Sequence, residues 1–244
     1  MNLLDDSPRF ELVRIAGIPV RVDITFALVP LFLLGSFGHA PFATAAIASV
    51  VIVAGVFMSV LFHELGHATV ARLSGIPVSE ILVGGFYGYA RMLETPQSTL
   101  TNVTILSAGP FGNAVLFLGL WSLLGFPEIS TSGYFGRIDP PEWLLNNPSL
   151  LHAVLTLALI NLAMLIFNLL PAFPLDGGRM YRDLLAMVAP RRTASRMIAG
   201  FGVGIGLWSA LVGLRIDIVL MLIGAQIAIL NWAVLMQPAD LPHL

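Results

Sequence analysis

The sequence predicts an all-α polytopic membrane protein with about six transmembrane helices and short membrane-associated β-hairpins. Apolar residues make up 57% of the 244 residues and charged residues only 11%, whereas a soluble domain carries about 25% charged residues. The mean hydropathy is +0.88. Several apolar stretches reach the length of about 20 helical residues that crosses a bilayer. We therefore expect the chain to lie in the cell membrane, in contact with the lipid bilayer.

The predicted crossings are apolar stretches separated by polar residues, prolines and glycines. The first is short and contains Pro30, which a helix packed within protein can tolerate. We expect a single intramembrane domain over residues 1–244, with its core at 24–190 and two C-terminal spans within 195–236. The six predicted crossings are residues 24–38, 42–72, 99–125, 150–171, 195–213 and 216–236.

Two further segments are predicted to form short β-hairpins. Residues 10–22 mix charged and β-branched residues around Gly17 and Pro19, which is typical of a hairpin at the membrane surface. Residues 78–93 predict two strands about Gly84-Gly85. An extended peptide can add to a free strand edge. We therefore expect this second hairpin to offer an edge to an unwound substrate segment.

The distribution of arginine orients the predicted crossings. If both termini are cytoplasmic, ten of the twelve arginines lie in inner segments and only Arg137 and Arg215 lie outside. The positive-inside rule expects this asymmetry. The inner arginines are Arg9, Arg14, Arg21, Arg72, Arg91, Arg179, Arg182, Arg191, Arg192 and Arg196.

Composition also excludes several classes of function. The net charge is −2 and there is no basic run, so we expect no nucleic-acid partner. The chain has no cysteine, which excludes disulfides and thiolate metal ligands. Asp5 and Asp6 precede the first apolar run, so no cleaved signal peptide is expected. The sequence makes no prediction of an oligomeric state.

Two histidines and a glutamate stand at the inner end of the second predicted crossing, in the run His63-Glu64-Leu65-Gly66-His67. Positions i and i+4 lie on one face of a helix, one turn apart. His63 and His67 can therefore bind one metal ion, with Glu64 beside the water bound to it. Ionisable side chains in hydrocarbon cost roughly 2.5–3.5 kcal/mol each. That cost weighs against the alternative of two helix-capping histidines and a chance glutamate.

A catalytic zinc ion takes three protein ligands, and Asp176 is the best candidate for the third. The remaining histidines, His39, His152 and His243, fall at outer span ends or in the C-terminal tail. Asp176 follows the inner end of the fourth crossing, in a segment with two prolines and two glycines. Irregular backbone at membrane depth is tolerated where protein or a water-filled cavity satisfies it. The alternative is an aspartate that caps a helix in an inner loop.

The chain resembles the site-2 protease family of intramembrane zinc metalloproteases. The resemblance rests on the H-E-x-x-H helix and on Asn168, Pro171, Pro174, Leu175, Asp176 and Gly177, which match N-x-x-P-x-x-P-L-D-G. Two weaker matches are Ser107-Ala-Gly109-Pro110-Phe-Gly-Asn113 and the run Leu82 to Met92. Many relatives carry a PDZ domain or a CBS pair, for which this chain has no room, so we expect the bare catalytic core.

The resemblance implies that His63, His67 and Asp176 bind one Zn²⁺ ion and that Glu64 is the catalytic base. It also implies that Asn168 contacts the substrate or its oxyanion. An interhelical hydrogen bond is the alternative role for Asn168. We expect Asn113, beside Gly109 and Pro110 at the start of a span, to serve structural packing. The implied function is hydrolysis of a peptide bond within or near the transmembrane segment of membrane-protein substrates.

Two other classes of function compete with an intramembrane endopeptidase. A metal transporter should place ionisable ligands across several spans, but the candidates here gather at one depth. A catalytically silent scaffold that binds zinc for stability would have no need of Glu64. Gly200, Gly202, Gly204 and Gly206 predict a stripe for close helix packing rather than a dinucleotide site, because the pattern lacks G-x-G-x-x-G.

Overall fold

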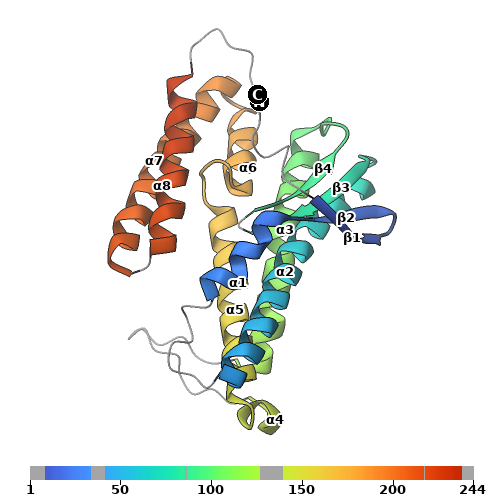
Figure 1. Ribbon diagram of the computed structural model, residues 1–244. Coiled ribbons are helices and arrows are strands. Elements are labelled where there is room, and N and C mark those ends of the chain that lie inside the picture. The colour runs from blue at the N-terminus through green and yellow to red at the C-terminus, as the bar shows by residue number, and fades with distance from the viewer. Residues whose placement is uncertain (1–8, 34–41, 86, 127–139, 217, 238–244) are drawn as a thin grey trace. The chain divides into compact units, whose positions relative to one another are not determined.

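The computed structural model describes residues 9–33, 42–85, 87–126, 140–216 and 218–237. The chain divides into two compact units. The first unit comprises residues up to 95 together with 111–165, and the second comprises 96–110 together with 166–244. Each unit is described by itself below, and the element labels are those of Figure 1.

The first unit contains one small mixed β-sheet with the strand order β1-β2-β3-β4. Strands β1 (Arg9–Ile15) and β2 (Ile18–Asp23) form the predicted N-terminal hairpin, and β3 (Val78–Val83) and β4 (Gly88–Met92) form the second hairpin. Both hairpin predictions are confirmed. Parallel pairing of β2 with β3, with Val20 opposite Ile81, joins the hairpins into one sheet. That pairing does not follow from the sequence pattern of either hairpin.

The sheet packs on helix α2 (Phe42–Leu73). The buried cluster joins Val20, Ile81 and Val83 of the sheet to Leu61 and Ala68 of the helix. Leu61, Leu65 and Ala68 follow each other at helical spacing, which gives α2 an apolar stripe toward the sheet. At about 1.5 Å per residue, α2 is about 48 Å long, so it exceeds the hydrocarbon thickness and its C-terminal part can carry both the sheet and polar side chains.

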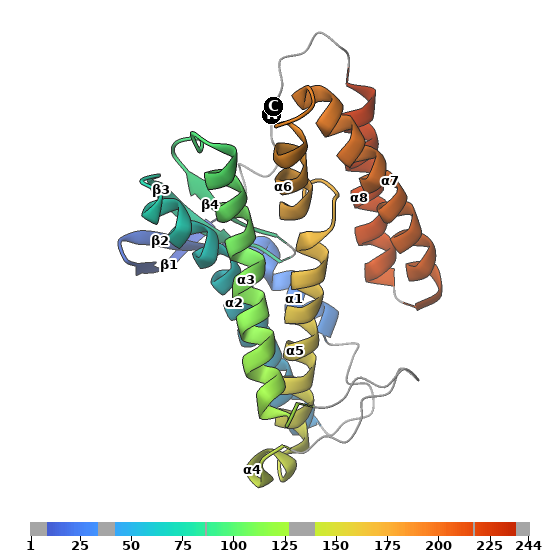
Figure 2. The same cartoon turned by 180° about the vertical axis from the view of Figure 1, so that it is seen from behind.

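Two further long helices belong largely to the first unit. Helices α3 (Thr99–Leu123) and α5 (Pro148–Leu169) run side by side, as the view in Figure 2 shows. The C-terminal end of α3 meets the N-terminal end of α5 in a buried cluster around Trp121, Leu124 and Val154. Leu144 of the short helix α4 (Glu142–Leu145) belongs to the same cluster. Residues 127–139, which include Arg137, lie outside the described part of the chain.

The second unit contains α6 (Asp176–Leu185), α7 (Arg191–Ile216) and α8 (Ile218–Met236). Helices α7 and α8 pack against each other along their lengths (Figure 1). The glycine prediction is half wrong. A Cβ on Gly202 or Gly206 would meet atoms of α8, whereas Gly200 and Gly204 face open space. Helix positions i and i+4 share a face, so alternate glycines cannot form one stripe.

Five of the predicted crossings are confirmed as helices of sufficient length and apolar composition, in the part of the chain that the structure describes. They are α2, α3, α5, α7 and α8, with mean hydropathy between 1.6 and 2.4. The first predicted crossing, residues 24–38, contains the 3₁₀ turn η1 (Ile24–Ala27) and helix α1 (Leu28–Leu33). Residues 34–38 of that stretch lie outside the described residues.

Candidate metal centre

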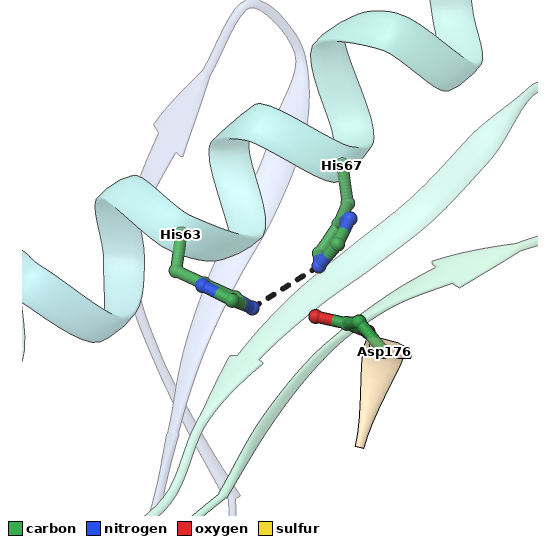
Figure 3. A group of neighbouring side chains, drawn as sticks. All are labelled: His63, His67 and Asp176. Carbon is green, nitrogen blue, oxygen red and sulfur yellow. Dashed lines mark hydrogen bonds between the residues drawn. The ribbon is translucent and has the colours of Figure 1, made fainter. Parts of the chain in front are cut away.

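The two histidines of the H-E-x-x-H motif present their rings from successive turns of α2. His63 and His67 are both 5% exposed, and their ring planes cross at 81°. Nε2 of His63 lies 3.1 Å from Nε2 of His67, as the dashed line in Figure 3 marks. The four-residue spacing predicts this arrangement, because one helical turn places both side chains on one face.

The distance between these nitrogens fits a divalent metal ion. Zinc binds imidazole nitrogen at about 2.0–2.1 Å, and two such bonds at a tetrahedral angle separate the nitrogens by about 3.3–3.4 Å. The observed 3.1 Å requires only a small rotation of the rings. Nitrogen ligands together with carboxylate oxygen, and no thiolate, form a set that zinc accepts.

Glu64 lies between the two histidines in sequence and faces the sheet. Its side chain is 5% exposed. Gly88, the first residue of β4, lies directly beside the carboxylate, since a Cβ built on Gly88 would come within 2.7 Å of Oε1 of Glu64. Only glycine allows the strand to approach the carboxylate so closely. The structure therefore brings a buried acid, an imidazole pair and a strand end together.

Asn113 of α3, which the sequence predicts to serve structural packing, contacts the first histidine of the motif. Its Oδ1 lies 2.6 Å from Nδ1 of His63, and the residue has no exposed surface. A hydrogen bond at the far ring nitrogen orients a metal-binding histidine and selects its tautomer. The sequence signal for this contact is the segment Gly109-Pro110-Phe-Gly-Asn113, which resembles the A-G-P-x-x-N motif of the family.

Gly112 explains why Asn113 can reach the histidine. A Cβ on Gly112 would lie 3.2 Å from the carbonyl oxygen of Phe62 in α2, so a larger residue would push the two helices apart. The two helices approach closely at the turn of α2 that carries His63. Asn113 then follows Gly112 directly and spans the short gap between the helices.

Asp176 belongs to the second unit, where it is the first residue of α6. The N-cap position is held by Leu175, which makes no side-chain capping hydrogen bond, so Asp176 is not the helix cap that the alternative interpretation supposed. A carboxylate in the first turn is favoured by the helix dipole. Asp176 is drawn with the two histidines in Figure 3.

The backbone is held in place on both sides of Asp176. Asn231 of α8 accepts a hydrogen bond from the backbone N–H of Phe173 at 3.0 Å and donates to the Phe173 carbonyl oxygen at 2.6 Å. Asn231 is fully buried. After Asp176, Gly177 lies against the backbone at the end of α5, where a Cβ would come within 2.5 Å of Leu169. These contacts fix the polypeptide on either side of the aspartate.

The other buried acids of the described chain have different partners. Glu80 forms ion pairs with Arg21 and Arg91, and Asp23 accepts the backbone N–H of Thr25. Asp183 of α6 pairs with Arg182. Burial opposes ionisation of Asp183, but Arg182, Asn102 and Arg191 together outweigh burial and hold its pKa below the ordinary value of 3.8. Glu64 is thus the buried carboxylate placed beside the histidine pair.

Asn168 lies in the last turn of α5, within the second unit, and is half-buried. The structure therefore brings His63, Glu64 and His67 together in the first unit and adds Asn113 to them. The roles of Asp176 and Asn168 at that site remain predictions.

The chain matches a known family over most of its length. The model of peptidase family M50 matches residues 51–133 and 142–213, which include most of α2 with both histidines and the segment with Asp176. A zinc metalloprotease of Methanocaldococcus jannaschii is 32% identical over 214 residues, which cover 87% of this chain and 56% of that protein. Stage IV sporulation protein FB of Bacillus subtilis is 27% identical over 139 residues, 57% of this chain and 41% of that protein.

A solved structure agrees with these matches. The site-2 protease from Methanocaldococcus jannaschii superposes with a TM-score of 0.61 at 27% sequence identity, and the alignment covers 97% of this chain and 99% of that chain. The chain spans about a third to just over half the length of the first curated relatives it matches.

Proposed function

Because the chain belongs to peptidase family M50, we propose that it is an intramembrane zinc endopeptidase of the site-2 protease type. It hydrolyses a peptide bond within or near the transmembrane segment of membrane-protein substrates. The observation that carries this proposal is the buried His63-Glu64-His67 arrangement on a helix long enough to span a membrane. A silent zinc scaffold would not require a buried carboxylate beside the imidazole pair.

The proposed metal ligands are His63, His67 and Asp176. The two imidazole nitrogens have a separation suited to zinc, and Asp176 stands in a segment that Asn231 and Gly177 hold in place. The buried carboxylates Glu80 and Asp183 support this choice by elimination, since both are paired with arginines. When bound, zinc polarises the substrate carbonyl and lowers the pKa of water toward neutrality.

Glu64 is proposed as the general base and then the general acid. Its carboxylate takes a proton from the attacking water, whose oxygen adds to the peptide carbonyl carbon. The same carboxyl group then gives that proton to the amide nitrogen as the carbon–nitrogen bond breaks, so that a carboxylic acid and an amine leave. The side-chain amide of Asn168 is proposed to donate a hydrogen bond to the oxyanion of the tetrahedral intermediate.

Substrate is proposed to bind as an extended strand along β4. An intact helix hides its carbonyl groups in i to i−4 hydrogen bonds, so the scissile segment must unwind before attack. Strand β4 is the last strand in the sheet order, and its first residue adjoins Glu64. A peptide added to this edge by main-chain hydrogen bonds would pass the proposed base. Substrates with a helix-stabilised segment should then be cut more slowly than helix-weakened ones, and equal rates would exclude this binding mode.

Both termini are proposed to be cytoplasmic. Four of the arginines assigned to the inside belong to the sheet or contact it: Arg9, Arg21 and Arg91 surround Glu80, and Arg72 donates to the carbonyl oxygen of Ala16. The chain has no cysteine, so a single introduced thiol reports topology cleanly. An impermeant maleimide added to intact cells should label Asn146→Cys and spare Glu94→Cys, and the reverse pattern would overturn the orientation.

The decisive experiment compares membrane peptide fragments from cells that express the wild type, Glu64→Gln or Glu94→Gln. Glu94 is an exposed carboxylate in the turn after β4, so its substitution serves as a matched control. Fragments made by this protein should appear with the wild type and the control and disappear with Glu64→Gln. The purified wild type should contain one zinc ion per chain. Identical fragment sets, or a purified protein that binds no zinc, would refute the proposal.

A further inference from the structure

A chain of buried polar side chains leads from the interior of the helices to the first histidine of the metal centre. We propose that Ser59, Asn161 and Asn113 together set the tautomer of His63, so that Nδ1 carries the proton and Nε2 offers a lone pair. Both asparagines are 0% exposed and Ser59 is 3% exposed. These residues come from α2, α3 and α5 within the first unit. The inference rests on the proposed function only where it names zinc as the metal.

Backbone carbonyl groups fix the direction of the hydrogen bonds, because they can only accept. The hydroxyl of Ser59 donates its single proton to the carbonyl oxygen of Gly55 at 2.8 Å. The side-chain nitrogen of Asn161 donates to the carbonyl oxygen of Leu157 and to Oγ of Ser59, both at 2.9 Å. Both N–H groups of that amide are then used, so its oxygen is the atom that faces Asn113.

The orientation of Asn113 follows from that of Asn161. The side-chain nitrogen of Asn113 donates to Oδ1 of Asn161 at 3.0 Å and toward the Ser59 carbonyl oxygen at 3.5 Å. A flipped amide would set the oxygen of Asn113 against two acceptors, the Asn161 oxygen and the Ser59 carbonyl. Because Asn113 and Asn161 are fully buried, water cannot satisfy the oxygen of a flipped Asn113 amide, and unpaired buried polar groups are costly.

The oxygen of Asn113 therefore faces Nδ1 of His63, at 2.6 Å. An amide oxygen can only accept, so Nδ1 must carry the proton. A neutral imidazole with its proton on Nδ1 has its lone pair on Nε2, the atom that lies 3.1 Å from Nε2 of His67. Metal binding requires this lone pair. The three side chains are positioning residues, since they act on the metal through His63.

The tautomer can be measured directly on the metal-free full-length protein in lipid nanodiscs, with ¹⁵N-labelled histidine. Nitrogen chemical shifts distinguish a protonated from an unprotonated ring nitrogen, and the spectrum of His63→Gln identifies the signals of His63. The wild type should show a protonated Nδ1 and an unprotonated Nε2. A wild-type His63 protonated at Nε2 would overturn the proposal.

Variants test each step of the chain. Asn113→Leu should give a mixture of tautomers and weaken zinc binding by roughly 10–100-fold, the usual effect of losing such a supporting hydrogen bond. Asn161→Leu should act in the same direction, because the Asn113 amide is then free to flip.

Asn102→Leu is a matched control. Asn102 lies three turns earlier in α3, and its side-chain nitrogen donates a hydrogen bond to Asp183. Its substitution should leave the His63 signals unchanged. The proposal is wrong if the folded Asn113→Leu and Asn161→Leu proteins keep the wild-type tautomer and zinc affinity. A chain with the expected tautomer that binds zinc and cleaves nothing would support this inference and refute the proposed function, so the two can fail separately.

Discussion

Gly88 and Glu64 lie in direct contact, so that a Cβ added to the glycine would be 2.7 Å from the carboxylate oxygen Oε1 and 2.9 Å from Cγ1 of Val60. The end of a β-strand therefore meets the proposed catalytic base with no side chain between them. This contact links the sheet, which forms from two hairpins, to the helix that carries the metal-binding motif.

Substituting Gly88 by valine should impair catalysis without removing zinc. The added methyl groups must displace either β4 or the Glu64 carboxylate, and a misplacement of about 1 Å can cost up to roughly 100-fold in rate. Cleavage of a fluorescent transmembrane reporter and zinc content would be measured together. The control is Gly119→Ala, where the added Cβ meets nothing within 4 Å. Equal rates for Gly88→Val and the control would show that the contact does not matter.

Glu64→Gln should keep one zinc ion per chain and lose at least about 100-fold in cleavage rate. The amide retains the size of the side chain but cannot take the proton from water, and general acid–base catalysis contributes roughly 10²–10⁴-fold. Single-turnover cleavage and metal analysis of the same preparation check both parts. Residual activity near that of the wild type would remove Glu64 from the mechanism.

His67→Gln and Asp176→Asn should each reduce zinc occupancy more than any substitution of a supporting residue, because each removes a proposed ligand. His152→Gln is the matched control, since His152 is an exposed histidine near the start of α5. Zinc per chain would be measured after dialysis against a weak chelator. If Asp176→Asn binds zinc as tightly as His152→Gln does, Asp176 is not the third ligand.

Asp183 should make stability depend on acid pH. Its folded-state pKa lies below the ordinary value of 3.8, so the unfolded chain binds more protons there and stability rises with pH. The contribution is fully present above 3.8 and is lost as the pH falls through the lower pKa of the folded state. The free energy of unfolding should therefore fall less steeply with acidification in Asp183→Asn than in the wild type. Glu94→Gln, an exposed control, should keep the wild-type slope.

The two faces of α7 should respond oppositely to added methyl groups. Gly206→Ala places a Cβ against the backbone of Ala228 in α8, and such overpacking costs roughly 1–3 kcal/mol. Gly204→Ala meets open space and should be neutral or stabilising by up to about 1 kcal/mol, because alanine favours helix. Denaturant unfolding in mixed micelles would compare them. Similar losses in both would mean that α7 and α8 do not pack as described.

Local features of the site were predictable from the sequence because they depend on short-range geometry. The spacing of His63 and His67 places both rings on one face of any α-helix. Gly17, between β1 and β2, has a φ of 83°, and such turn residues indicate hairpins directly. The faces of the glycines in α7 also follow from helical periodicity, because Gly202 and Gly206 share one face and Gly200 and Gly204 share another.

Composition and periodicity determined by themselves that this chain forms long apolar helices, two hairpins and a histidine pair beside a glutamate, since each feature depends on neighbours within a few residues. Only the tertiary structure decided that β2 pairs with β3 across about 60 positions and that Asn113 meets His63 from another helix. The physical reason is that helix–helix and strand–strand contacts between distant segments depend on which surfaces pack together, and one residue's type does not encode its distant partner.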